Sequence, residues 1–192
     1  MNSTSILRTS AQAVDVAGNV YIADTGNKRI RKVTIDGAIA TFAGQTASLE
    51  PGDGGPALEA FLDYPTYLAV SCTALYVNDS SRIRAIALTA PLIAQNGVVS
   101  TASSSTTVRA GEQFAISGCN LASSTATADP AFSIPTTLGG MTASVNGISV
   151  PLLSVSPNQI TAQLPAGVTA GTATLVVSVT GNGTATASMS VN

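Results

Sequence analysis

Apolar and polar residues alternate in four short segments near the start of the chain, at residues 13–16, 20–23, 29–35 and 38–43. Alternation with a period of two predicts half-buried β-strands. The stretch DTGN at 24–27 predicts a tight turn, in which we expect Asp24 to accept amide hydrogen bonds and Gly26 to adopt a positive φ. Asp-Gly at 36–37 is a strong two-residue hairpin signal. Four consecutive antiparallel strands are typical of one blade of a β-propeller.

A weaker copy of this pattern follows about one blade length later. YLAVS, ALYVN and RIRAIAL predict three strands that begin at residues 67, 74 and 82, with the turn DSS between the last two. The copies align over four pairs, which are Tyr21 with Tyr76, Asp24 with Asp79, Ile30 with Ile83, and Arg31 with Arg84. Self-similarity at such a period indicates a repeat architecture.

The motif GNVYIADTGNKRIRKV, residues 18–33, resembles the NHL repeat, and the connector GDGGPALEAFLDYPTYLAV resembles the inter-blade segment of bacterial NHL proteins. The resemblance covers residues 11–88. The second copy departs from it, because Ser80-Ser81 replaces the usual Gly-Asn of the turn and Asn78 replaces the usual Ala.

The resemblance implies a structural role for the repeat positions, with Asp and Arg bracketing the turn in each copy. These positions are Asp24, Asn27, Arg29, Ile30, Arg31, Asp79, Arg82, Ile83 and Arg84. Asp24 would pair with Arg29 or Arg31, and Asp79 with Arg82 or Arg84. The alternative is a candidate ligand rim for an anion, formed by Arg29, Arg31, Arg82 and Arg84.

Two blades do not close a propeller, which takes about four to eight. Three arrangements satisfy the remaining apolar faces: further blades in a longer protein, other copies of the chain, or the second domain. We expect the first of these.

The second half predicts an immunoglobulin-like β-sandwich of about seven short strands. MTASV and ISVPLL flank Asn146-Gly147, a preferred type I′ turn, and a last hairpin surrounds residues 181–183. The expected fold class is all-β, a partial β-propeller of about two NHL blades plus an immunoglobulin-like sandwich. The expected domains are the blades at 1–90, a linker at 91–95 and the sandwich at 96–192.

This half also resembles the C-terminal domain of secreted Acidobacteria proteins, which is related to the IPT/TIG group. The residues that carry the resemblance are AGEQFAISGCNLA (110–122), the segment 134–165 and AGTATLVVSV (170–179). It implies an extracellular or cell-surface setting and no particular reaction. Cys119 stands where the family usually has Ser or Thr.

Charge is scarce and favours no nucleic-acid partner. Charged residues make up 9% of the chain, the net charge is −2, and beyond residue 90 only Arg109, Glu112 and Asp129 are charged. No apolar run is long enough for a membrane span, and the first ten residues lack the apolar core of a signal peptide.

The residue types of several catalytic classes are missing. The chain has no His, which excludes Ser-His-Asp and Cys-His sites within it. GDGG at 52–55 lacks the alternating acidic ligands of a calcium loop. Asp53, Glu59 and Asp63 lie in one connector, which favours a solvated loop over an acid/base pair. We therefore expect no catalytic, cofactor or metal site.

The two cysteines, Cys72 and Cys119, lie one in each half of the chain. An internal disulfide would have to bridge the halves, and we expect two small buried apolar side chains instead. The sequence does not decide whether either thiol is reactive.

The function expected from these features is a non-enzymatic extracellular binding scaffold, part of a larger secreted NHL-repeat protein. Its partners would be proteins or cell-surface carbohydrate, with self-association through exposed blade faces. The alternative is the remnant of a propeller enzyme whose active site lies in blades outside this chain.

Overall fold

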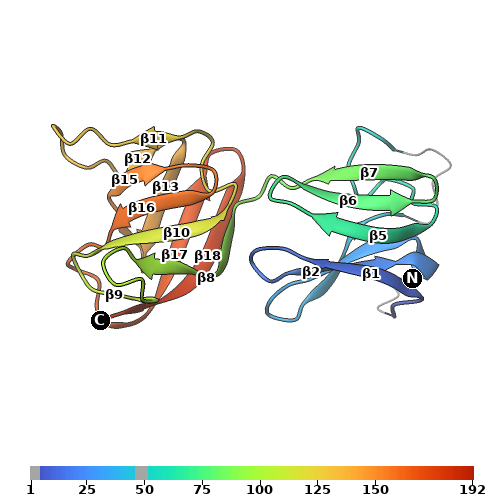
Figure 1. Ribbon diagram of the computed structural model, residues 1–192, viewed down its shortest axis with the longest axis horizontal. Coiled ribbons are helices and arrows are strands. Elements are labelled where there is room, and N and C mark those ends of the chain that lie inside the picture. Colours follow the sequence, from blue (N-terminus) through green and yellow to red (C-terminus); the bar gives the residue numbers. More distant parts are fainter. Residues whose placement is uncertain (1–4, 46–51) are drawn as a thin grey trace. The chain divides into compact units, whose positions relative to one another are not determined.

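The computed structural model describes residues 5–45 and 52–192, and the chain divides into two compact units, residues 1–88 and 89–192. Both units consist of β-sheets, in which the strand pairs are antiparallel except for one short parallel pair in the second unit (Figure 1). The described residues contain a single short 3-10 helix, η1 (Thr25–Asn27). The expected all-β class is thus confirmed. No helix in the described ranges has the length or apolar character that crossing a bilayer requires.

The first sheet has four strands in the order of the sequence. They are β1 (Thr9–Val14), β2 (Val20–Asp24), β3 (Arg29–Val33) and β4 (Ile39–Ala43). The first strand begins and ends earlier than the predicted segment 13–16. It ends there because the Asp15 carboxylate accepts hydrogen bonds from the backbone N–H of Ala17 and of Asn19, both at 3.0 Å, which forms a local turn.

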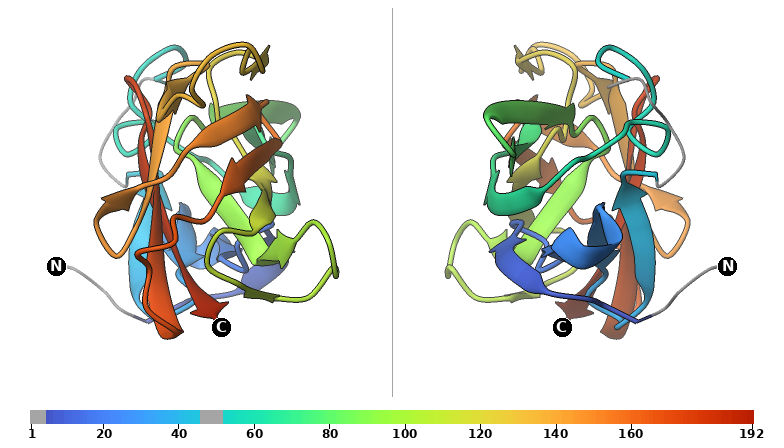
Figure 2. Two further views of the ribbon diagram at one scale, coloured as in Figure 1. Left: turned by 90° about the vertical axis from the view of Figure 1, so that its left-hand side faces the viewer. Right: turned by 90° about the vertical axis from the view of Figure 1, so that its right-hand side faces the viewer.

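The second sheet repeats only three of these strands, β5 (Pro65–Val70), β6 (Ala74–Asp79) and β7 (Arg82–Ala87). The blue strands β1–β4 and the green strands β5–β7 can be followed as two separate sheets in Figure 2. β7 corresponds to β3, which is paired with β4 on its outer side. Among the described residues no strand takes the place of β4 beside β7, so β7 is an edge strand.

Strand register makes the two sheets equivalent residue by residue. The row Ala13–Tyr21–Lys32 corresponds to Ala69–Tyr76–Ala85, and the pair Ala23–Ile30 to Asn78–Ile83. We call the side of each sheet that carries these residues face A. The opposite side, face B, carries Val14, Val20, Ile22, Arg31 and Val33 in the first sheet and Val70, Leu75, Val77, Arg84 and Ile86 in the second.

The core of the first unit forms between face A of the first sheet and face B of the second. Tyr21, Ala23 and Ile30 are buried there together with Leu75 and Val77. Leu68, Val70 and Ile86 are partly buried against this cluster, and β5 lies beside β1 and β2 (Figure 1). The first sheet therefore buries its face A in this core, and the second sheet buries its face B.

The second unit is a sandwich of two sheets with its own core. One sheet has the strand order β11-β15-β16-β10-β8 and the other β12-β13-β17-β18-β9, with β14 paired to β13. Both inner faces contribute to a single buried cluster that includes Phe114, Leu152 and Leu175. The strand bounds are β8 (Leu92–Ser100), β9 (Thr107–Val108), β10 (Gln113–Cys119), β11 (Ala126–Thr127), β12 (Thr137–Leu138), β13 (Met141–Val145), β14 (Ile148–Ser149), β15 (Leu152–Val155), β16 (Gln159–Gln163), β17 (Gly171–Val179) and β18 (Gly183–Val191).

The expected linker at 91–95 is wrong for most of its length. β8 starts at Leu92, pairs with β10, and buries Ile93 in the core of the sandwich. Gly118 permits this pairing, since a Cβ at that position would lie 2.0 Å from the carbonyl oxygen of Leu92. The sequence signal was obscured because polar residues interrupt the apolar pattern along β8.

The hairpin predicted around Asn146-Gly147 is confirmed at its turn but not along the whole of its second strand. Asn146 and Gly147 have φ values of 49° and 80°, which agrees with the type I′ turn between β13 and β14. The segment ISVPLL, however, is not one strand. β14 pairs with β13, whereas β15 pairs with β16 in the other sheet, so the chain changes sheets at Val150-Pro151.

Two further expectations are corrected. Neither Cys72 nor Cys119 is a free thiol, so the expectation of two simple buried apolar side chains is wrong. Gly26 does not have a positive φ. Lys28 does, at 56°, and Gly26 is required because a Cβ there would lie 2.7 Å from the carbonyl oxygen of Leu7.

Candidate binding cleft

The repeat aspartate of the first copy is fully buried at the end of β2. Asp24 accepts hydrogen bonds from the backbone N–H of Leu7 at 2.8 Å and from the Asn27 side-chain amide. Its Oδ2 lies 3.8 Å from Nε of Arg31, whose side chain is also buried. The carboxylate therefore fixes the segment that enters β1, and it does not bond the turn amides as the sequence indicated.

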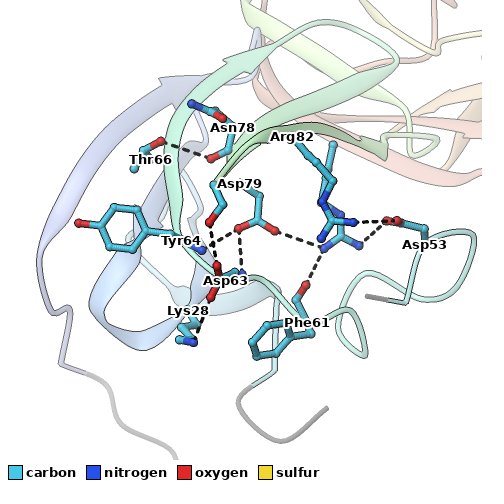
Figure 3. A network of polar contacts seen from close by, with 11 residues as sticks. Lys28, Asp53, Phe61, Asp63, Tyr64, Thr66, Asn78, Asp79 and Arg82 are labelled. Carbon is cyan, nitrogen blue, oxygen red and sulfur yellow. Dashed lines mark hydrogen bonds and ion pairs between the residues drawn. The ribbon is translucent and has the colours of Figure 1, made fainter. Parts of the chain in front are cut away.

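The second copy reproduces this arrangement. Asp79 accepts hydrogen bonds from the backbone N–H of Asp63 at 2.9 Å and of Tyr64 at 2.8 Å, just before β5, and it pairs with Arg84 at 3.6 Å (Figure 3). The predicted Asp–Arg pairs thus take the form Asp24–Arg31 and Asp79–Arg84. The neighbouring Arg29 and Arg82 are not the partners of these aspartates.

An exposed contact joins the two copies. Asp63 lies 3.5 Å from Lys28 and accepts a hydrogen bond from the Ser80 hydroxyl at 2.8 Å. The Ser80 hydrogen bond and the Lys28 charge hold the pKa of Asp63 below its usual range. Lys28 also lies over the Phe61 ring, 4.9 Å from its centroid. Both groups are exposed, so this contact contributes little to stability.

An open cleft of about 590 Å³ lies along the free edge of β7. The cleft lies where the described part of the chain places no strand beside β7, whereas β4 occupies the corresponding place beside β3. Loop residues 52–60 form one wall and β7 the other. The lining residues are Ala43, Gly52, Asp53, Gly54, Gly55, Ala57, Ala60, Leu62, Val77, Arg82, Ile83, Arg84, Ala85, Ile86 and Ala87.

Two guanidinium groups and one carboxylate provide the charge of the cleft. Arg84 pairs with Asp53 at 2.6 Å, and Arg82 lies 3.9 Å from the same carboxylate (Figure 3). Arg84 also donates to the Phe61 carbonyl oxygen at 2.6 Å. The Arg84 side chain is 10% exposed, whereas those of Arg82 and Asp53 are 52% and 62% exposed. Arg84 is therefore positioned from several sides, while Arg82 and Asp53 face solvent.

The candidate rim of four arginines is not continuous. Arg82 and Arg84 line the cleft, but Arg31 is 3% exposed and pairs with Asp24, so it cannot belong to a solvent-facing rim. Arg29 is partly buried on β3 and does not line the cleft. The hypothesis of an anion-binding rim is thus reduced to Arg82 and Arg84.

The connector carboxylates do not gather into one site. Asp53 pairs with Arg84 and Asp63 with Lys28, while Glu59 follows a turn closed by its own N–H to the Pro56 carbonyl oxygen. Within residues 5–45 and 52–192, no cluster of three or more His, Cys, Asp or Glu side chains forms a potential metal site.

Sequence reasoning missed the role of Asp53 and of the Phe61 carbonyl. Both contact β7 across sequence separations of more than twenty residues, and no local pattern predicts such contacts. The signal that was present is the resemblance of residues 52–70 to an inter-blade connector, which implies that this loop lies beside the strands of the repeat.

Comparison with known families defines the second unit. Residues 98–192 match the IPT/TIG domain family, and this part of the chain is an IPT/TIG domain with an immunoglobulin-like fold. The match confirms that part of the resemblance noted in the sequence. No curated protein matches the chain.

Similarities to solved structures are low. SGBP-B of the Bacteroides ovatus mixed-linkage glucan utilization locus, in complex with mixed-linkage heptasaccharide, is 14% identical, with 94% of this chain and 54% of that chain covered and a TM-score of 0.37. The gamma-CGTase of alkalophilic Bacillus clarkii is 13% identical, with 96% and 25% covered and a TM-score of 0.41.

A catalytically inactive virginiamycin B lyase from Staphylococcus aureus, solved with quinupristin, is 12% identical, with 100% of this chain and 83% of that chain covered and a TM-score of 0.23. This chain thus spans about half of the SGBP-B chain and a quarter of the gamma-CGTase chain.

Proposed function

We propose that this chain is a non-enzymatic extracellular binding scaffold, part of an NHL-repeat protein, whose first unit binds a ligand that carries carboxylates. The ligand is a cell-surface carbohydrate or a protein. The IPT/TIG domain supports an extracellular or cell-surface setting. The proposal also includes self-association of the chain through the exposed sheet faces of the first unit.

The observation that carries the proposal is the pair Arg82 and Arg84 at the open cleft. A cleft of about 590 Å³ has the size of many ligand sites. Guanidinium groups bind carboxylates through strong charge-assisted hydrogen bonds. Asp53, itself a carboxylate on an exposed loop, already contacts both arginines. A ligand carboxylate would take its place.

Calorimetric titration with an acidic oligosaccharide and with a neutral one of the same length tests this function, and an acidic peptide distinguishes a carbohydrate from a protein ligand. We expect the acidic ligand to bind, with an affinity that falls as salt is added. Arg82→Ala should weaken binding about 10-fold or more, because a charge-assisted hydrogen bond is lost. Asp53→Asn should strengthen binding, since it frees the arginines.

Arg109→Ala is the matched control, because Arg109 is an exposed arginine of the second unit. Equal binding of acidic and neutral ligands, or an Arg82→Ala variant that binds like the control, would contradict the proposal.

A further inference from the structure

The outer face of the β5–β7 sheet is apolar and exposed. Tyr67, Tyr76 and Ile83 are 70%, 44% and 78% exposed, and Ala69 and Ala85 between them are also exposed. These residues lie on face A, as the row Ala69–Tyr76–Ala85 and the pair Asn78–Ile83 show. The face carries no charged side chain along these rows.

Face A of the first sheet shows what covers such a surface. Its equivalent residues Tyr21 and Ile30 are 1% and 0% exposed, because face B of the second sheet packs on them through Leu75 and Val77. The protein therefore contains one complete example of face A packed against face B. Face A of the second sheet has the same register, but no sheet formed by residues 5–45 or 52–192 is seen to cover it.

The matching surface is present on the other side of the first sheet. Face B there carries Val14, Val20, Ile22 and Val33, which correspond to the residues Val70, Leu75, Val77 and Ile86 that cover face A within the unit. Val14 is 57% exposed, and Val20, Ile22 and Val33 are partly exposed. One molecule thus presents an uncovered face A and an uncovered apolar face B.

We infer that a second copy of this chain covers face A of the β5–β7 sheet with face B of its own β1–β4 sheet. The contact repeats between molecules the packing that already exists inside each molecule. It joins two different surfaces, so it is heterologous, and copies add head to tail until a ring closes or a filament grows. The inference rests on the self-association in the proposed function and names its two surfaces, with a second copy in place of the further blades expected from the sequence, and it does not depend on the ligand of the cleft.

Paired variants that each block one surface test the inference on the full chain. Ile83→Asp places a charge on face A, and Val14→Asp places one on face B. Both positions are exposed in the monomer, so the fold should tolerate the change, while burial of an unpaired charge in the contact is costly. Phe132→Asp, at a 74% exposed position of the second unit, is the matched control.

Light scattering on separated fractions gives the mass of each sample. The wild type and Phe132→Asp should exceed the chain mass of 19.1 kDa as concentration rises, while each blocked variant stays at that mass. A mixture of the two blocked variants should form a dimer, because one intact face A remains to meet one intact face B. Unchanged circular dichroism confirms that the variants fold.

Three results would overturn the inference: a wild type that stays monomeric up to near-millimolar concentration, blocked variants that associate like the wild type, or a mixture that forms no dimer. A monomeric wild type that binds an oligosaccharide or another protein through Tyr67 and Tyr76 would assign the face to that partner instead.

Discussion

The two sheets of the first unit differ in exposure although they share one pattern. Tyr21 and Ile30 are buried in the first sheet, while the equivalent Tyr76 and Ile83 are 44% and 78% exposed in the second. The aspartates are buried in both copies, Asp24 at 0% and Asp79 at 1% exposed. The buried Asp–Arg pair is thus a property of the repeat itself, whereas burial of the apolar face depends on a neighbouring sheet.

The second unit shows the other way to bury a sheet. Its two sheets enclose one core to which both contribute, and that core needs no further neighbour. The first unit stacks sheets in one direction, and such a stack always leaves two outer faces unless it closes on itself. This contrast explains why large exposed apolar side chains such as Tyr67 and Ile83 lie on strands of the first unit.

Tyrosine fluorescence can follow the first unit alone. All four tyrosines, Tyr21, Tyr64, Tyr67 and Tyr76, lie in it, and the chain has no tryptophan. Urea unfolding monitored by this signal, at concentrations where the chain is monomeric, therefore reports the stability of the first unit.

Removal of the repeat aspartate should have the largest effect on stability, and this effect should differ between the two copies. Asp24→Ala leaves the buried Arg31 without its carboxylate and should lower the free energy of unfolding by about 3–5 kcal/mol. Asp79→Ala should cost less, about 1–3 kcal/mol, because Arg84 keeps its contacts to Asp53 and to the Phe61 carbonyl oxygen. Equal losses would mean that these extra contacts of Arg84 do not stabilise the fold.

Truncation of the equivalent isoleucines tests the difference in burial. Ile30→Ala should cost about 2–5 kcal/mol, because it leaves a cavity in the core between the sheets. Ile83→Ala should change the free energy of unfolding by no more than about 0.5 kcal/mol, because the side chain is exposed. A large loss for Ile83→Ala in the monomer would show that its face is already covered within the chain.

Removal of a tyrosine hydroxyl should have the smallest effect on the free energy of unfolding, and this effect should depend on pH. Tyr21 donates a hydrogen bond to Asp15 at 3.3 Å, and burial, helped by the Asp15 charge, raises the pKa of Tyr21 above its usual value. The fold thus favours the protonated hydroxyl. This contribution to stability is complete below the unfolded-state pKa of about 10 and is lost as pH rises from there through the folded-state pKa.

Tyr21→Phe should therefore cost about 1 kcal/mol at neutral pH and should flatten the loss of stability above pH 10. Tyr76→Phe is the matched control, and it should change neither the stability at neutral pH nor the loss of stability above pH 10. Urea unfolding at neutral and alkaline pH measures both effects. A wild type whose stability falls above pH 10 no faster than that of Tyr21→Phe would contradict the assigned hydrogen bond and burial.

Much of the first unit could be predicted from local patterns. The alternation over residues 13–43 and 67–88 predicted seven strands, and the structure has all seven with changed ends. The pairing of Asp24 with an arginine could also be predicted, but not which arginine. That choice depends on strand register, which places Arg31 beside Ile22 on the same side as Asp24.

Features that depend on contacts distant in sequence could not be predicted. The cleft depends on two facts: in the described ranges no strand pairs with the outer side of β7, and loop 52–60 lies opposite. No local sequence pattern predicts either of them. The sequence predicts a linker at 91–95, where β8 begins, because Gln95, Asn96 and Gly97 interrupt the apolar residues of this strand. Its pairing with β10 requires Gly118, whose role appears only when the two strands lie together.

The most direct test of the central claim is the rate of tyrosine nitration, followed by peptide mass spectrometry as protein concentration rises. If face A of the second sheet is covered by another copy, Tyr67 and Tyr76 should react in dilute solution and become protected at high concentration. Tyr64, which is 52% exposed and precedes β5, should stay reactive, and Tyr21 should be protected throughout. Reaction of Tyr76 at the rate of Tyr64 at every concentration would contradict the account.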